Sequence, residues 1–276
     1  MLGRENILRQ LNTKWAACNI IYKEVTESTN NDAADLSRDG AENGTLVVAD
    51  RQIKGRGSRG RSWETPPGSN IAMSLIIRPT APADRISMLT LVMGLSVAEG
   101  IDLALSQSGC EGSCCRIKWP NDIVIGNRKV CGILTELHMY PDNRIRDVVI
   151  GVGINVNMTD FPEEIRDMAG SLLTETGKKV DRSLVVARCM ECFEENYFKY
   201  QMNYDLSLLK DQYESRLVNR DERVRVLDPK GEYEGRALGI DRFGALEIKV
   251  QGDDGGSRIR SINAGEVSVR GLYGYV

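Results

Sequence analysis

The chain has 276 residues, 41% of them hydrophobic and 27% charged, and a formal net charge of −3. This composition excludes a disordered chain, which would combine low hydrophobicity with a high net charge. The slightly acidic total also argues against a protein whose main task is to bind duplex DNA, because such proteins usually present a net basic surface. The length is sufficient for one large domain and one small domain.

The N-terminal part is predicted to form a helix, a strand and a second helix. Apolar residues on one side favour a short helix over residues 1–12, and residues 20–25 form a predicted strand. The polar triplet Ser28-Thr29-Asn30 precedes a predicted helix over residues 31–38. Any of these three side chains could cap that helix. The free N–H groups at the same helix end could also bind a carboxylate or another polar ligand.

The most unusual segment is residues 52–63, Gln-Ile-Lys-Gly-Arg-Gly-Ser-Arg-Gly-Arg-Ser-Trp, between predicted strands at 45–50 and 70–77. Its glycines disfavour a helix or a regular strand and let the backbone approach a ligand closely. Its arginines are forked cationic donors suited to phosphate or carboxylate. A flexible basic loop without a ligand, or a surface loop that touches nucleic acid, would have the same composition.

The middle of the chain is predicted to contain one long helix and a run of antiparallel strands. A helix over residues 82–105 carries an apolar run that Glu99, Gly100 and Asp102 interrupt. Because a bilayer-spanning helix needs ~18 apolar residues, we expect a core helix. Strands are expected at residues 71–78, 116–119, 123–125, 130–139 and 148–156, with a hairpin turn at 126–127. Consecutive antiparallel strands with helices elsewhere indicate an α+β fold.

The last of these strands contains two glycines, in the run Gly151-Val152-Gly153-Ile154-Asn155. The glycines could mark a bulge or close packing. They could also let a ligand approach, with Asn155 as a polar anchor. The run lacks the strand-to-helix context of a dinucleotide-binding fingerprint, so we discount a Rossmann site.

The C-terminal part is of a different kind. Two amphipathic helices, expected over residues 183–201 and 206–217, precede it. From residue 222 onward, five short predicted strands alternate with polar turns, which is typical of a small barrel. The sequence therefore predicts two domains, residues 1–219 and residues 220–276.

The chain has seven cysteines and one histidine, His138. A zinc site would require two Cys-x-x-Cys pairs or nearby histidines. The one such pair, Cys189 and Cys192, lies in a helical pattern that favours burial as small hydrophobic residues. The odd count, without a secretory leader, predicts reduced thiols, no metal site and a cytoplasmic location.

Three sequence blocks, taken in order, resemble those of biotin protein ligases. The first combines Gln52, Gly55-Arg56-Gly57, Arg59-Gly60-Arg61 and Trp63 with Pro67-Gly68-Ser69-Asn70, and it resembles the adenylate-binding loop of that family. The second and third are Lys118-Trp119-Pro120-Asn121-Asp122 and the run over residues 128–136, Arg-Lys-Val-Cys-Gly-Ile-Leu-Thr-Glu. Residues 28–30 resemble the biotin-contacting triplet of the family. Residues 239–241 and 265–268 resemble parts of its SH3-like C-terminal domain, so the resemblance covers essentially the whole chain.

This resemblance implies the architecture of the family. We expect an α+β fold, with a mixed β-sheet and flanking helices as in class II synthetases and biotin ligases, plus a small SH3-like C-terminal β-barrel. Some members carry an N-terminal DNA-binding domain and repress transcription. Too few residues precede Glu24 for a winged helix-turn-helix, so the short, enzyme-only form is expected.

The resemblance also implies an activity. We expect a biotin–[acetyl-CoA-carboxylase] ligase that uses ATP, with Mg²⁺ as co-ion, to make biotinyl-5′-AMP and that transfers biotin to a lysine of a biotin carboxyl carrier protein. DNA and membranes are not expected as partners, and a homodimer is possible. The alternatives are a lipoate–protein ligase, which uses the same acyl-adenylate chemistry, and a nucleic-acid-binding regulator.

The site residues follow from the matched blocks. The expected catalytic residues are Lys129, Arg56 and Asp122. The expected biotin- or adenylate-binding residues are Ser28, Thr29, Asn30, Gln52, Gly55, Arg56, Gly57, Ser58, Arg59, Arg61, Trp63, Lys118, Asn121, Lys129, Gly132 and Asn155. Some of them also have a plainer reading: Lys129 as a solvated strand-edge lysine, Trp63 as a packing residue and Asp122 as a turn residue.

One position departs from the pattern of the family. Members often have arginine where this chain has Ser58, and serine replaces neither the charge nor the reach of arginine. Lys54 adds a cation to the same loop. We therefore expect Lys54 to compensate in part for Ser58.

Overall fold

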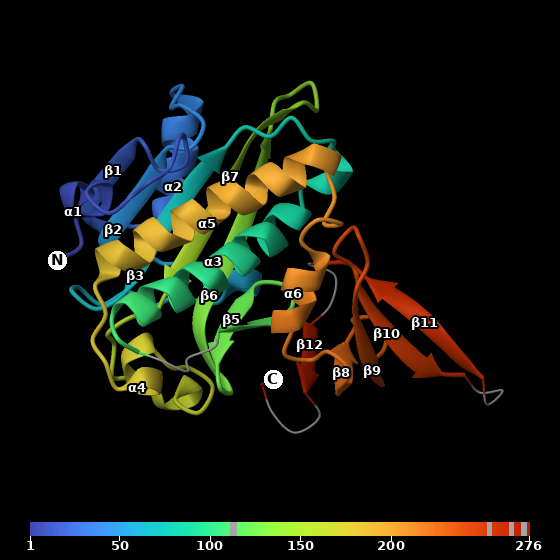
Figure 1. Ribbon diagram of the computed structural model, residues 1–276. Coiled ribbons are helices and arrows are strands. Elements are labelled where there is room, and N and C mark those ends of the chain that lie inside the picture. The colour runs from blue at the N-terminus through green and yellow to red at the C-terminus, as the bar shows by residue number, and fades with distance from the viewer. Residues whose placement is uncertain (111–114, 253–255, 265–267, 272–274) are drawn as a thin grey trace.

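The computed structural model describes residues 1–110, 115–252, 256–264, 268–271 and 275–276, which form two β-sheets with flanking helices (Figure 1). The predictions that concern Cys114 and residues 265–267 lie outside the described residues. The larger sheet and its helices precede the smaller sheet in the chain. The expected α+β architecture is confirmed.

The larger sheet has seven strands. In spatial order they are β1 (Ile20–Thr26), β2 (Leu46–Gln52), β3 (Ile71–Ile77), β7 (Ile145–Ile154), β6 (Arg128–Met139), β5 (Asp122–Ile125) and β4 (Arg116–Lys118). β1 and β2 are parallel, and α2 (Thr29–Arg38) is the crossover between them. The other neighbouring pairs are antiparallel, so the sheet is mixed, as predicted.

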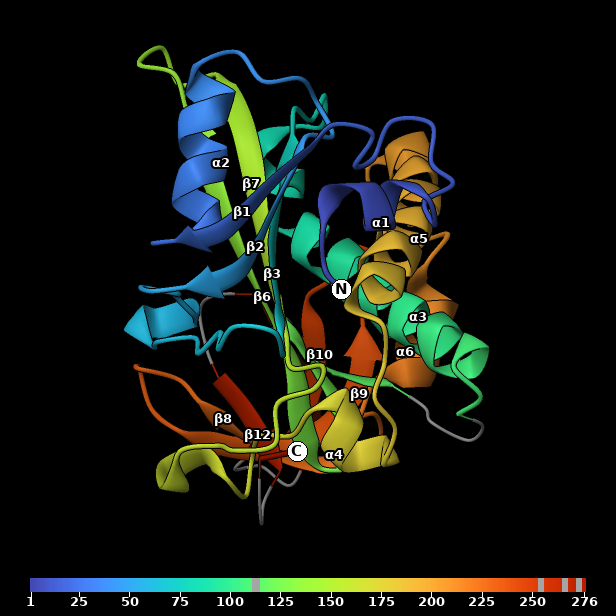
Figure 2. The same cartoon turned by 90° about the vertical axis from the view of Figure 1, so that its left-hand side faces the viewer.

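Helices cover both faces of this sheet. α2 packs on one face through a small apolar cluster of Ala33, Val47, Ile76 and Val149. The other face carries α1 (Arg4–Leu8), α3 (Met88–Gln107) and α5 (Arg182–Asn203), as Figure 2 shows. The main apolar core lies between that face and α3 and α5. Among these four helices, α2 alone lies on the same face of the sheet as the loop over residues 52–63 (Figure 2).

α3 is the central helix of this core. The stretch Ala83–Gln107 is long and apolar enough, by length and composition, to cross a membrane, but 78% of its most apolar window is buried inside the protein. The expected core helix is confirmed, although by burial and not by its interrupting polar residues. α5 satisfies one of those residues, because Asn196 Nδ2 donates to Glu99 Oε2 at 2.8 Å. Gly100 lets the two helices meet, since a Cβ there would lie 2.5 Å from the Cys189 backbone.

The smaller sheet has five antiparallel strands, as the sequence predicts. In spatial order they are β11 (Ser257–Ile262), β10 (Leu246–Gln251), β9 (Tyr233–Ile240), β8 (Arg223–Leu227) and β12 (Ser268–Gly271). This arrangement is consistent with an SH3-like domain. Trp119 Nε1 donates to Gly244 O at 3.0 Å and so joins the two parts of the chain. The exact domain boundary at residues 219 and 220 stays a prediction.

Some helices differ from the sequence prediction. The helix expected over residues 82–105 divides into a 3₁₀ turn, η2 (Ala83–Arg85), and α3, while the one expected over 206–217 is reduced to α6 (Lys210–Arg216). The short helices η1 (Ser58–Gly60), η3 (Glu163–Ile165) and α4 (Leu172–Thr176) were not predicted. α4 depends on its ends: Ser171 and Thr174 form a capping box, and Gly177 ends the helix with φ +72°.

Candidate active site

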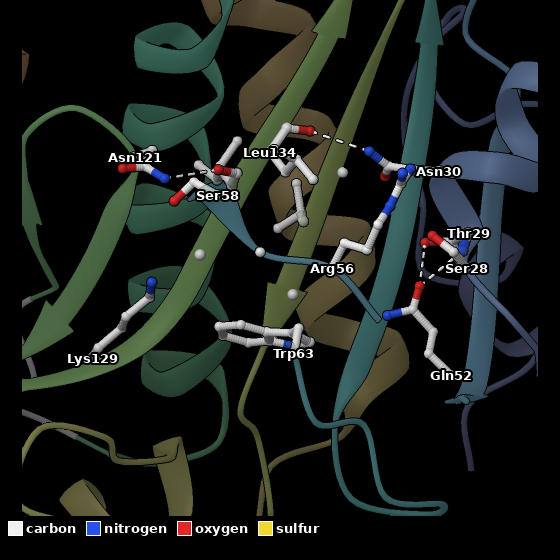
Figure 3. A pocket seen from close by; sticks show the side chains of 16 residues that line it. Ser28, Thr29, Asn30, Gln52, Arg56, Ser58, Trp63, Asn121, Lys129 and Leu134 are labelled. Carbon is white, nitrogen blue, oxygen red and sulfur yellow. Dashed lines mark hydrogen bonds between the residues drawn. The ribbon is translucent and has the colours of Figure 1, made fainter. Parts of the chain in front are cut away.

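A cavity opens where the N-terminus of α2 meets the loop over residues 52–63 and strands β6 and β7. Its lining residues are Ser28, Thr29, Asn30, Gln52, Arg56, Gly57, Ser58, Trp63, Asn121, Lys129, Gly132, Ile133, Leu134, Gly151, Val152 and Gly153. Figure 3 shows Lys129 and Asn121 on one side, the three residues that begin α2 on the other, and Trp63 between them. The wall of this cavity therefore brings together segments that lie far apart in the sequence and that were predicted to contribute to the site one by one.

Gln52, at the end of β2, holds the first turn of α2. Its Oε1 accepts hydrogen bonds from Thr29 N at 2.8 Å and from Thr29 Oγ1 at 3.0 Å (Figure 3). Ser28 occupies the N-cap position, but its side chain makes no capping hydrogen bond. A side chain from the neighbouring strand thus does the capping that we expected from the triplet itself.

Asn30 belongs to a buried polar network beneath the cavity. Ser74 Oγ, on β3, lies 2.7 Å from Asn30 Oδ1 and 2.8 Å from Thr29 Oγ1. Asn30 Nδ2 donates to Glu136 Oε2 at 2.6 Å and lies 3.5 Å from Leu134 O (Figure 3). The amide N–H groups of Asn30 therefore face protein acceptors. Its carbonyl oxygen, with two lone pairs, is the group that can serve a ligand donor.

The glycines of β7 make room for the side chains that shape this cavity. A Cβ on Gly151 would lie 2.0 Å from Asn30 Oδ1, and a Cβ on Gly153 would lie 2.3 Å from the indole of Trp63. Real Cβ atoms do not come so close to their neighbours. Of the two readings of this run, close packing describes both glycines, and both of them also line the cavity.

Trp63 packs against β7 and also lines the cavity. Its ring lies against Gly153, and Lys129 Nζ lies 5.6 Å from the ring centroid. Trp63 N donates to Gly55 O at 2.9 Å, which closes the base of the loop. A Cβ on Gly55 would lie 2.3 Å from Trp63 O, so glycine is required there. Gly55 thus supports the loop and is not part of the cavity wall.

A second cavity adjoins the first and lies between the two sheets. Ser58, Asn121, Ile133 and Leu134 line both cavities. The other residues of the second lining include Arg61, Lys118, Trp119, Asp122, Arg270 and Tyr275. Three of these, Arg61, Lys118 and Asp122, were expected in the site. The two cavities together therefore contain most of the predicted site residues.

Asp122 joins two cavity residues from different parts of the chain. Lys129 Nζ lies 2.6 Å from Asp122 Oδ1, and the Tyr275 hydroxyl donates to Asp122 Oδ2. The side chains of Lys129 and Asp122 are 22% and 11% exposed. Lys129 is therefore a partly buried, paired cation, which differs from the solvated strand-edge lysine of the plainer reading.

Lys118 is buried near the same carboxylate. Its Nζ lies 4.0 Å from the ring centroid of Tyr275. Burial lowers the pKa of Lys118 from 10.5 to about 8, which nearby Asp122 opposes and Lys129 reinforces. An anion bound beside this ammonium would favour its charged form and raise the pKa again.

We expect the substitution Lys118→Met to stabilise the protein at neutral pH. The unfolded chain binds more protons than the folded one between pH about 8 and 10.5. The destabilising effect of Lys118 is therefore complete below pH 8 and disappears as the pH rises through this window. Urea unfolding should give a gain of ~2 kcal/mol at about pH 7 that shrinks by about pH 10.

The matched control is Lys54→Met, because Lys54 is exposed. Its stability should follow wild type across the same pH range. A gain for Lys118→Met that is equal at both pH values would contradict the assignment of the effect to the charge of Lys118.

Two of the expected residues, Asn155 and Gly55, do not lie on the wall of either cavity. Asn155 is buried, where its Nδ2 donates to Gly170 O at 3.0 Å and its Oδ1 accepts from Asn70 Nδ2 at 3.2 Å. Gly55 supports the loop, as described above. The side chain of Arg59 lies outside the described part of the chain. Lys54 pairs with Glu27 at 2.8 Å on the exposed surface and lines neither cavity, so the expectation that it compensates for Ser58 has no structural support.

Three residues that contact predicted site residues through polar or cation–π contacts were not themselves predicted. Ser74 and Glu136 belong to the polar network around Asn30, and Tyr275 contacts Asp122 and Lys118. Ser74 is the one polar residue in the apolar strand β3, and Glu136 ends the third matched block. Both signals were present in the sequence. Tyr275 had no such signal, because its role depends on the contact between the two sheets.

Comparison with known proteins gives matches over both parts of the chain. Residues 22–155 match the biotin/lipoate A/B protein ligase family, and residues 221–270 match the biotin protein ligase C-terminal domain. The bifunctional ligase/repressor BirA of Bacillus spizizenii is 40% identical over 91% of this chain and 75% of its own length. The biotin–[acetyl-CoA-carboxylase] ligase of Mycobacterium tuberculosis is 31% identical over 92% of this chain and 89% of its own.

A solved structure is similar over nearly the same extent. The biotin protein ligase of Aquifex aeolicus, in complex with biotin and ATP, superposes with a TM-score of 0.76 at 32% identity. The match covers 92% of this chain and 99% of that one.

Proposed function

This chain belongs to the biotin/lipoate A/B protein ligase family, and from that premise we propose that it activates biotin with ATP and transfers it to a lysine of an acceptor protein. The chain is a biotin ligase enzyme. Biotin and ATP, which the Aquifex aeolicus relative binds, are its expected substrates. The acceptor that we propose is a biotin carboxyl carrier protein.

The observation that carries this proposal is that one cavity has a hydrogen-bond acceptor at one end and a cation at the other. At one end lies the side-chain carbonyl oxygen of Asn30. The N–H groups of the same amide already face Glu136 and Leu134, so the oxygen is the group that can accept from a ligand. At the other end lies the ammonium of Lys129. Biotin has N–H donors on its ureido ring and a carboxylate at the far end of its chain. Lipoate has the carboxylate but no N–H group, so Asn30 favours biotin over lipoate.

The reaction proceeds in two steps. A carboxylate is a poor electrophile, so an oxygen of the biotin carboxylate first attacks the α-phosphorus of ATP, and the bond to pyrophosphate breaks. The acceptor amine then attacks the carbonyl of biotinyl-5′-AMP, an amide forms and AMP leaves. Because the first step brings two anions together, catalysis rests on positioning and on neutralisation of charge.

The proposed roles follow from charge and place. Lys129 would neutralise the biotin carboxylate and then the mixed anhydride, while Arg56 and Arg61 would face the phosphates. Asp122 would orient or deprotonate the acceptor lysine in the second step. No group of three His, Cys, Asp or Glu side chains among the described residues could hold a metal ion. The Mg²⁺ that we propose would enter with the polyphosphate, whose oxygens are ligands that it prefers and whose charge it would neutralise.

The test is transfer to a defined acceptor. The chain should add one biotin to a biotin carboxyl carrier domain when biotin, Mg²⁺ and ATP are present, and intact-protein mass spectrometry would detect the addition. Lipoate in place of biotin should give no addition. No mass shift with biotin, or an equal shift with lipoate, would overturn the proposal. A cytoplasmic location, a homodimer and the absence of DNA binding stay predictions.

A further inference from the structure

The carboxylate of Glu136, on β6, contacts both the start of α2 and the loop over residues 52–63. Its Oε2 accepts a hydrogen bond from Asn30 Nδ2 at 2.6 Å. Arg56 Nη2 lies 3.1 Å from Oε1 and 3.4 Å from Oε2 of the same carboxylate. One side chain thus connects the proposed biotin contact with a cation of the proposed adenylate loop.

Glu136 determines which way the amide of Asn30 points. A carboxylate accepts hydrogen bonds but has none to donate, so it selects the NH₂ group of Asn30. The Ser74 hydroxyl, whose Oγ lies 2.7 Å from Asn30 Oδ1, can donate to that oxygen but can also accept a hydrogen bond, so it does not fix the amide by itself. Without Glu136 the amide could turn over, and its NH₂ group would then face a ureido N–H and repel it.

Glu136 also holds Arg56 close to the cavity, and this contact leaves some of the N–H donors of Arg56 for a ligand. Within the described residues, the hydrogen bonds of Arg56 to Asn31 Oδ1 and to Glu136 all come from Nη2. A guanidinium has five N–H donors, so Nε and Nη1 remain for a phosphate. The side chains of Arg56 and Glu136 are 49% and 28% exposed. Their pairing also compensates the negative charge of Glu136, which would otherwise repel an anionic ligand.

We propose that Glu136 is a positioning residue that couples the binding of biotin to the binding of ATP. This inference rests on the proposed function. Biotin that binds Asn30 Oδ1 fixes Asn30, and Asn30 fixes the carboxylate that orients Arg56 toward the phosphates. Because coupling between two ligands is reciprocal, ATP must strengthen biotin binding by the same factor.

The experiment measures this coupling with a ligand pair that cannot react. α,β-Methylene-ATP carries a carbon in place of the oxygen that would leave with pyrophosphate. Its dissociation constant, by isothermal titration calorimetry, is compared with and without saturating biotin. We expect biotin to tighten binding of the analogue by ~10-fold in the wild type. Glu136→Ala should reduce this factor to about 1 and should also weaken biotin itself.

Glu136→Gln separates positioning from a general structural effect. Glutamine keeps an oxygen for Asn30, so biotin affinity should stay within ~3-fold of the wild type. It lacks the charge that holds Arg56, so the coupling should still disappear. The matched control is Glu27→Gln, an exposed carboxylate that pairs with Lys54 outside both cavities, and it should retain full coupling.

The outcomes are distinct. Coupling that survives in Glu136→Gln, or a wild type that binds biotin without any coupling, would overturn the role of Glu136. If biotin affinity and coupling fall in parallel in Glu136→Ala and in Glu136→Gln, Glu136 has a structural role alone. That result would also overturn the proposed positioning role. A wild type that does not bind biotin at all would instead overturn the proposed function.

Discussion

The substitution Lys129→Met is expected to slow formation of biotinyl-5′-AMP by at least ~100-fold. Lys129 is a cation on the wall of the first cavity, 2.6 Å from Asp122 and 5.6 Å from the ring centroid of Trp63. It is partly buried, so its charge is less screened than that of a surface lysine. Removing one such group from an anionic transition state typically costs ~3 kcal/mol. Biotin-dependent exchange of pyrophosphate into ATP measures this step directly.

The fold should tolerate the substitution, because Asp122 keeps a hydrogen bond from the Tyr275 hydroxyl when Lys129 is gone. Its thermal unfolding should therefore remain cooperative. Lys54→Met is the matched control: it removes a lysine from the loop over residues 52–63, but one that pairs with Glu27 on the surface. Equal exchange rates for wild type and Lys129→Met would rule out this role for Lys129. A slow Lys54→Met variant would show that the effect is not specific to the cavity.

The substitution Gly151→Ala is expected to weaken biotin binding by ~10- to 100-fold. The added methyl would lie 2.0 Å from Asn30 Oδ1, so the Asn30 side chain must leave its place beside Ser74 and Glu136. A ligand donor in the cavity then loses its acceptor, which costs ~1–3 kcal/mol for a buried group. Equilibrium titration with biotin, without ATP, measures this loss separately from catalysis.

Gly94→Ala provides a control for the methyl group itself. Gly94 is also buried, but it lies in α3, and a Cβ there would have its nearest neighbour at 3.8 Å. Alanine is a better helix former than glycine, so this variant should be as stable as wild type or more so, by ~0.5–1 kcal/mol. Its biotin affinity should not change. If Gly151→Ala also bound biotin normally, Asn30 could not be the acceptor that selects the ureido ring.

Local patterns in the sequence were sufficient for most of the fold. The strands were predicted from apolar runs, continuous in β3 and alternating with polar residues in β8, and from the turn residues that separate them, as at Gly126 and Asn127 between β5 and β6. α4 was missed because five residues carry too little periodicity, and its capping box is recognised only once Ser171 is known to precede a helix. Local pattern therefore predicts elements that are long enough to repeat it.

The candidate site was predictable in its members but not in its contacts. The matched blocks identified Gln52 and Lys129, the triplet over residues 28–30 identified Asn30, and all three line one cavity. Gln52 nevertheless uses its side-chain oxygen on α2, and Asn155 is engaged with Gly170 away from the cavity. Such partners lie far apart in the chain, Asn30 and Glu136 for example 106 positions. A motif shows that a residue is needed without showing what it touches.

The contacts of Tyr275 have a consequence for the design of chimaeric enzymes. This residue, beyond the last strand of the small sheet, touches Asp122 and Lys118 of the large one, and Trp119 bonds back to Gly244. A hybrid that took its C-terminal part from a relative would place that relative's own residue, in place of Tyr275, beside Asp122. The small sheet is therefore not an exchangeable module. Swaps between homologues should transplant the segment over residues 118–122 together with the C-terminal part.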